Sequence, residues 1–216
     1  MKIKNSLKEL IILDNLKDGM TEKQISVLLT AIDLFSEKGY EATSTSEIAK
    51  KANVAEGTIF RYYKTKKDLL FAIPTVLSKA SLFETFFDDF NELWNSDHEN
   101  FENFLRKLIL NRKIFISETM PILKVIIQEL SFHPELRDKI LNTVLLPAVN
   151  RFIIIIDKFK DKGEIIDIPS TSIVNLIGTS IFGYFFVHNI ALPELKQDDG
   201  ELDYLIQYIL NGLCKK

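Results

Sequence analysis

The stretch from Ser44 to Lys66 constrains the fold more than any other part of this 216-residue chain. Ser44 is followed three residues later by Glu47, which is the pattern of a capping box. In that motif the hydroxyl accepts from the backbone N–H at the third position, and the carboxylate reaches back. Asn53 is one of the few residue types besides glycine that tolerate a left-handed backbone. The spacing therefore predicts two short helices joined by a tight turn.

The apolar residues of this stretch fit two helices that cross closely. Ile48, Ala49 and Ala52 form a narrow apolar face on the first helix, where a small side chain at position 49 allows close approach. Three residues form the predicted inward side of the second helix: Ile59, Phe60 and Tyr63. The pair is therefore interpreted as a helix-turn-helix.

Strand signals are nearly absent from the chain, so an all-α fold is predicted. Residues 1–20 are an N-terminal extension in which 3–17 could form a short helix. Residues 21–67 are the expected three-helix head, and 68–216 a helical body. A helix is expected from Thr21 to Gly39, because glycine often ends a helix in the left-handed conformation. A long helix is expected from Thr65 to about Trp94, with Pro74 as a kink.

Further helices are expected over 99–117, 121–132, 134–161, 169–192 and 199–212. The longest apolar run, from Ile173 to Leu192, contains Asn, Ser, Thr and His residues. It is therefore interpreted as a buried helix and not as a membrane span.

The formal net charge of -3 does not by itself indicate a nucleic-acid-binding protein, so charge has to be examined locally. Between Thr43 and Ala72, six basic residues stand against three acidic ones, a local net charge of +3. The single cysteine, Cys214, excludes an internal disulfide and fits a reducing cytoplasm. The N-terminus carries too many charges for the apolar region of a signal peptide. A cytoplasmic location is therefore expected.

The run GYEATSTSEIAKKANVAEGTIFRYYKTKKDLL resembles the DNA-binding head of the TetR family of transcriptional repressors. The resemblance covers residues 21–70, and the rest of the chain is similar only in being helical and of suitable length. The motifs that carry it are Gly39-Tyr40, Ile48-Ala49, Gly57-Thr58-Ile59 with the aromatic Phe60, Lys66 and Leu69-Leu70. The resemblance implies a body that binds a ligand and dimerises.

The expected DNA-binding residues are Ser44, Thr45, Glu56, Gly57, Thr58, Arg61, Tyr62 and Lys66. In similar proteins, the positions matching five of these contact DNA, and they are expected to hold phosphates. These five are Ser44, Thr45, Thr58, Tyr62 and Lys66. Arg61 can pair with guanine or bind a phosphate. Glu56 either accepts from cytosine or places negative charge at a helix N-terminus. Gly57 permits close approach of the backbone to DNA.

Three residues depart from the family pattern. Phe60 stands where tyrosine is frequent, so a hydroxyl contact to phosphate would be missing there. Tyr63 stands where a core phenylalanine is usual, and its hydroxyl must find a partner or reach solvent. Asn53 replaces the common turn glycine. None of these changes removes the helix-turn-helix.

Phenylalanines are concentrated in the body, where they form a core or line an apolar pocket for a small effector. The candidates for that pocket are Phe86, Phe90, Phe104, Phe115 and, as one polar handle, Glu129. No metal-ligand spacing, nucleophile elbow or phosphate loop occurs, so no cofactor, metal or enzymatic activity is expected. Apolar stripes in the last two helices, about 170–213, predict a homodimer that would match a palindromic operator.

These features together predict a ligand-controlled repressor. The effector would tilt the long helix after Lys66, with Pro74 as one place for it to yield. The alternatives are a helical adaptor whose head binds protein, and an enzyme with a helical body, which the missing catalytic residues disfavour.

Overall fold

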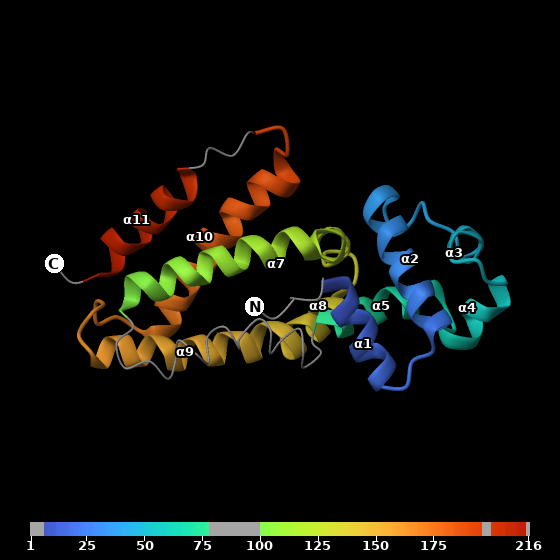
Figure 1. Cartoon of the computed structure of the whole chain (residues 1–216), viewed down its shortest axis with the longest axis horizontal. Coiled ribbons are helices and arrows are strands. Elements are labelled where there is room, and N and C mark those ends of the chain that lie inside the picture. Colours follow the sequence, from blue (N-terminus) through green and yellow to red (C-terminus); the bar gives the residue numbers. More distant parts are fainter. Residues whose placement is uncertain (1–6, 78–99, 196–199, 215–216) are drawn as a thin grey trace. The chain divides into compact units, whose positions relative to one another are not determined.

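The computed structural model describes residues 7–77, 100–195 and 200–214 (Figure 1). These residues are helical apart from turns, loops and one isolated β-bridge between Ile165 and Cys214, and they contain no strand. The all-α fold class predicted from the sequence is confirmed. The helices are α1 Leu7–Lys17, α2 Glu22–Lys38, α3 Thr45–Lys51, α4 Glu56–Tyr62, α5 Lys66–Leu77, α7 Phe101–Glu129, α8 Pro134–Ile140, α9 Leu146–Asp161, α10 Ser170–Phe186 and α11 Glu201–Leu213. Two π-helical segments are η1 Leu141–Leu145 and η2 Val187–Ala191.

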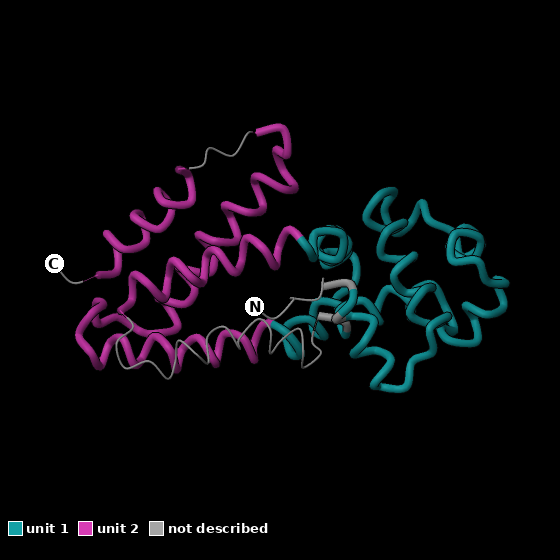
Figure 2. Tube along the Cα trace, in the orientation of Figure 1, with its two compact units in different colours: residues 1–87, 118–144 teal, residues 88–117, 145–216 magenta. Residues whose placement is uncertain are grey.

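Packing divides the chain into two compact units (Figure 2). The first comprises residues 1–87 and 118–144, and the second comprises 88–117 and 145–216. The helix α7 contributes to both. The head therefore packs in one unit with α5, α8 and the last turns of α7. The functional boundary expected at residue 67 stays a prediction.

Local signals determine the ends of the helices in the head. Thr21 caps α2 by accepting from the backbone N–H of Gln24, and Gly39 ends this helix with a φ of 87°. Ser44 caps α3 by accepting from the N–H of Glu47 at 3.1 Å. Asn53 has a φ of 54°, so it takes the left-handed conformation expected of the turn. The helix-turn-helix is thus built by the residues that predicted it.

The core of the first unit surrounds α2, which contacts α1, α3, α4 and α5. The helix α1 packs against α2 and buries Ile11 and Asn15, whose side-chain amide donates to the Ile11 carbonyl at 2.7 Å. The expected inward side of α4 is correct for Ile59 and Tyr63, which are buried. It is wrong for Phe60, which is 45% exposed, because α4 has only two turns and its single buried stripe runs through 59 and 63.

Two expected helix boundaries differ from the structure. The segments 99–117 and 121–132 form one helix, α7, with Pro121 inside it. Proline removes only one backbone N–H donor from the helix. Buried apolar residues lie both before and after Pro121, and their packing holds α7 together across it. The helix expected over 134–161 exists as α8, η1 and α9 in succession. The helix that begins at Lys66 is described to Leu77 with Pro74 inside it, and its expected continuation lies outside the described residues.

The described part of the second unit buries one face of α10 against α9 and α11. The buried residues on that face are Ile173, Ile177, Ile181 and Phe185. Two stretches, Pro134–Asp161 and Ser170–Ala191, are apolar and long enough to span a membrane by length and composition. In the second, only 22% of the most apolar window is buried within the chain, so much of its apolar surface is open.

Candidate nucleic-acid interface

The α3–α4 hairpin presents its polar side outward because its apolar side is fixed in the core. Ile48 and Ala49 of α3 and Ile59 of α4 are buried. The turn between the helices closes through a hydrogen bond of 3.0 Å from the Val54 N–H to the Ala49 carbonyl. The two helix starts, at Thr45 and Glu56, are thereby held in a defined relation.

A hydrogen bond joins those two helix starts directly. The Thr45 hydroxyl donates to the Glu56 carboxylate at 2.7 Å. A carboxylate has capacity for several donors, so Glu56 keeps acceptor positions open toward solvent. This bond is compatible with both interpretations of Glu56, as an acceptor for cytosine and as negative charge at a helix N-terminus. It also restricts the rotamers of Thr45 and Glu56 before DNA binds.

Tyr62, Arg61 and Thr21 form a second cluster on the same hairpin. The Tyr62 hydroxyl accepts from the Thr21 hydroxyl at 3.0 Å and from the Arg61 guanidinium at 2.9 Å. These two donors, Thr21 first, lower the pKa of Tyr62 below its ordinary value. Arg61 also lies over the Tyr62 ring, 4.9 Å from its centroid. Thr21 was expected only as a helix cap, and its contact with Tyr62, 41 positions away, could not be derived from local spacing.

Three further expected residues lie on the outer side of the hairpin. Ser44 is exposed at the start of α3, and Thr58 is half-buried in α4. Nothing lies within 4 Å of the position that a Cβ atom would occupy at Gly57. The backbone at Gly57 is therefore open to close approach, as expected.

Lys66 behaves differently from the other seven residues. Its side chain turns back into the head, where the ammonium donates to the carbonyls of Tyr40, Glu41 and Thr43. The direct phosphate contact expected from the resemblance stays a prediction, and this geometry offers another role.

The candidates for the effector pocket separate between the two units. Phe104 is a core residue of the second unit, with its ring centroid 6.3 Å from that of Phe101 and 5.3 Å from that of Phe159. Phe115 is half-buried in the same unit. Phe86 and Phe90 lie outside the described residues. Sequence reasoning overlooked Arg112, a buried residue of α7 whose guanidinium lies 5.5 Å from the centroid of the Phe115 ring. The available signal was spacing: Arg112 follows Ile109 by three residues and Leu108 by four, which places it on the same apolar face of a helix.

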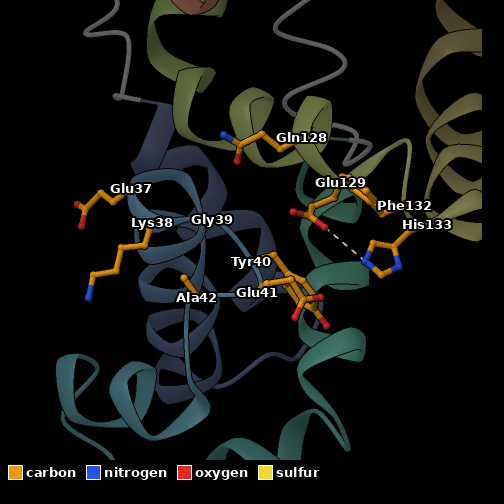
Figure 3. Close-up of a pocket in the computed structure, with 10 residues that line it drawn as sticks. All are labelled: Glu37, Lys38, Gly39, Tyr40, Glu41, Ala42, Gln128, Glu129, Phe132 and His133. Carbon is orange, nitrogen blue, oxygen red and sulfur yellow. Dashed lines mark ion pairs between the residues drawn. The ribbon is translucent and has the colours of Figure 1, made fainter.

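Glu129 lies in the first unit, beside a cleft of about 740 Å³ (Figure 3). Two segments line this cleft, 37–42 and 128–133. Burial raises the pKa of Glu129, and the attraction of His133 partly opposes the shift. The carboxylate lies 3.4 Å from the His133 ring nitrogen. Glu129 therefore pairs with His133 beside a cleft of the first unit, and its role as the polar handle of an effector pocket stays a prediction.

Comparisons with known proteins agree with this geometry. The profile of the family described as "Bacterial regulatory proteins, tetR family" matches residues 27–73. The uncharacterized HTH-type transcriptional regulator YvkB of Bacillus subtilis is 31% identical over 171 residues, covering 78% of this chain and 83% of that protein. The transposon Tn10 TetC protein of Escherichia coli is 38% identical over 101 residues, or 45% of this chain and about half, 51%, of TetC.

A solved structure resembles almost the whole chain. The transcriptional regulator FadR from Bacillus subtilis, crystallised with stearoyl-CoA, aligns with a TM-score of 0.69 over 87% of this chain and 98% of that chain. The two sequences are 22% identical, so this likeness concerns the fold alone.

Proposed function

The chain belongs to the TetR family of bacterial transcriptional regulators, and we propose that it is a ligand-responsive repressor that binds a palindromic operator as a homodimer. Membership of the family makes it a regulator with a DNA-binding helix-turn-helix and not an enzyme. The observation that supports the proposal most is the outer side of α3 and α4, where Thr45, Glu56, Arg61 and Tyr62 are held in hydrogen-bonded positions.

DNA recognition would divide between base edges and phosphates. With α4 in the major groove, Arg61 and Glu56 are the side chains suited to base edges. Ser44, Thr45, Thr58 and Tyr62 would hold phosphates, contacts that set the orientation of the head without specifying sequence. Gly57 would let the start of α4 approach the DNA closely.

The dimer would form through α10 and α11. Tyr204 and Tyr208, four residues apart on α11, are 71% and 72% exposed, and Leu176 and Phe182 of α10 are more than half exposed. Large apolar side chains exposed together mark interaction surfaces. A twofold dimer suits a palindromic operator whose half-sites lie about one DNA turn, roughly 34 Å, apart.

The body would bind a small, largely apolar group, and the acyl chains carried by long-chain acyl-CoA thioesters are the first to test, with the polar CoA part outside the apolar pocket. Two observations support this choice: the phenylalanine-rich second unit and the shared fold with a regulator crystallised with stearoyl-CoA. The effector must bind the DNA-competent and the released conformations with unequal affinity, or no release would follow. The DNA operator and the effector are both available in the cytoplasm, where we place the protein.

A gel-shift titration with the DNA upstream of the protein's own gene tests repression against the adaptor alternative. We expect salt-sensitive binding that Arg61→Ala abolishes. Arg137→Ala removes the same charge from an exposed ion pair with Asp138 in α8 and should bind normally. No binding by the wild type, or equal binding by Arg61→Ala, would favour the adaptor. Stearoyl-CoA should release the DNA while free CoA should not, and release by neither would refute the proposed effector class alone.

A further inference from the structure

We propose that Lys66 positions the N-terminus of α3 from inside the head and does not itself bind a DNA phosphate. The inference rests on the DNA-binding function proposed above and assigns Lys66 a place in it. The residue would act on DNA through its neighbours Ser44 and Thr45.

The Lys66 ammonium is fully used within the protein. It donates to the Tyr40 carbonyl at 2.9 Å, the Thr43 carbonyl at 3.1 Å and the Glu41 carbonyl at 3.4 Å. An ammonium has three N–H donors and no acceptor, so three carbonyls match its capacity. A phosphate could be bound only by giving up one of these bonds.

The surroundings of the ammonium favour the same position. The nitrogen lies 4.2 Å from the centroid of the buried Tyr40 ring, in the geometry of a cation–π contact. The Tyr40 ring makes T-shaped contacts with the rings of Phe35 and His133, whose centroids lie 5.2 and 5.6 Å away. Figure 3 shows Tyr40 and Glu41 on the segment that follows α2, with His133 on the other side of the cleft. The ring that receives the cation is thus itself fixed.

The root of the Lys66 side chain is fixed as well. The Thr65 hydroxyl accepts from the Asp68 N–H, and the Asp68 carboxylate accepts from the Thr65 N–H, both at 3.0 Å. This reciprocal cap defines the first turn of α5, where Lys66 is the first residue. The side chain therefore spans between two ordered points.

The three carbonyls belong to the turn that leads into α3. Within this turn the buried Thr43 donates from its hydroxyl to the Gly39 carbonyl at 2.9 Å and from its N–H to the Tyr40 carbonyl at 3.2 Å. The next residue, Ser44, is the cap of α3, and Thr45 is its first residue. Converging carbonyls repel one another unless a cation lies between them, so Lys66 fixes the direction in which α3 starts.

A charge-preserving substitution separates the two roles. Lys66→Arg keeps the positive charge, but its planar guanidinium does not place three donors around one point. Positioning predicts that Lys66→Arg weakens operator binding about tenfold or more, because contacts displaced by about 1 Å lose much of their effect. A phosphate contact predicts near-normal binding. Lys64→Arg, at an exposed lysine two residues earlier, is the matched control.

Coupling to Thr45 shows whether Lys66 acts through α3. In a Thr45→Val background, positioning predicts that Lys66→Arg costs clearly less affinity than it does in the wild type. Equal losses in both backgrounds would overturn the proposal, because a general loss of stability would be additive with Thr45→Val.

A measurement on the wild-type protein covers the case in which Lys66→Arg fails to fold. Nitrogen-15 NMR of the lysine ammonium groups should show slow hydrogen exchange at Lys66 in the free protein and little change when operator DNA is added. A Lys66 signal that is protected only in the complex would overturn the inference. If the wild type does not bind the operator at all, that result refutes the proposed DNA-binding function and, with it, the role of Lys66 that rests on it.

Discussion

Replacing Tyr63 with phenylalanine should stabilise the protein. Tyr63 ends α4 with its ring buried, and among the described residues its hydroxyl makes no hydrogen bond of ordinary geometry. Burial raises the pKa of this hydroxyl to about 12, an effect that the Gln24 side chain partly offsets. The sequence left two outcomes for this hydroxyl, a partner or solvent, and the structure shows neither.

The size of the effect follows from the missing bond. A buried polar group without a partner costs about 1–3 kcal/mol, and phenylalanine retains the ring that fills the core. Because Gln24 is near enough to act on the pKa of Tyr63, we expect the lower end, about 1 kcal/mol. For a chain of this length that corresponds to a rise in Tm of about 2–4 °C.

Urea denaturation of the two proteins at pH 7 and pH 11 measures the difference. Because burial raises the pKa of Tyr63 to about 12, the unfolded chain ionises at this residue before the folded protein does, so the wild type loses stability as pH rises from the ordinary value of 10.0 toward about 12. The advantage of Tyr63→Phe should therefore grow by about 1.4 kcal/mol between pH 7 and pH 11. Operator affinity should not change, since the residue is buried. A less stable Tyr63→Phe at pH 7 would refute the reasoning and show that the hydroxyl is satisfied.

Three further variants test other parts of the structure. Ser44→Ala removes the cap of α3 and should lower the free energy of unfolding by about 1 kcal/mol in urea titration, with Ser46→Ala as an exposed control that should change little. Glu129→Gln should be more stable than the wild type at pH 7, because burial raises the pKa of Glu129 and disfavours its charged form. That gain should disappear as pH falls below the ordinary glutamate value of 4.5, and a gain independent of pH would contradict the assignment. Replacing Tyr204 and Tyr208 together with glutamate should convert a dimer to a monomer in sedimentation, and an unchanged mass would exclude this face.

The parts of the head that sequence could predict are those with local causes. Ser44, Asn53 and Gly39 act on the backbone within a few residues of themselves, so their roles follow from residue type and spacing. The period of α2 could be recognised because that helix spans 17 residues. Such a length defines which side of a helix is buried.

The parts that sequence could not predict depend on tertiary contacts or on very short helices. In the seven-residue α4, two turns of pattern could not separate buried Tyr63 from exposed Phe60. The partners of Lys66 lie up to 26 positions away, and nothing in the spacing shows which way its side chain turns. Thr21 and Tyr62 meet for the same reason, through the packing of α2 against α4.

The central claim is that the outer side of α3 and α4 reads one DNA sequence. Incubating the protein with fragments of its own genome, and sequencing those that it retains at physiological salt, tests this most directly. We expect enrichment of an inverted repeat whose half-sites lie about one helical turn, roughly 10 base pairs, apart. Arg61→Ala should lose that enrichment while its fold is unchanged. If no fragment is enriched, or Arg61→Ala enriches the same fragments equally well, the account of this surface is contradicted.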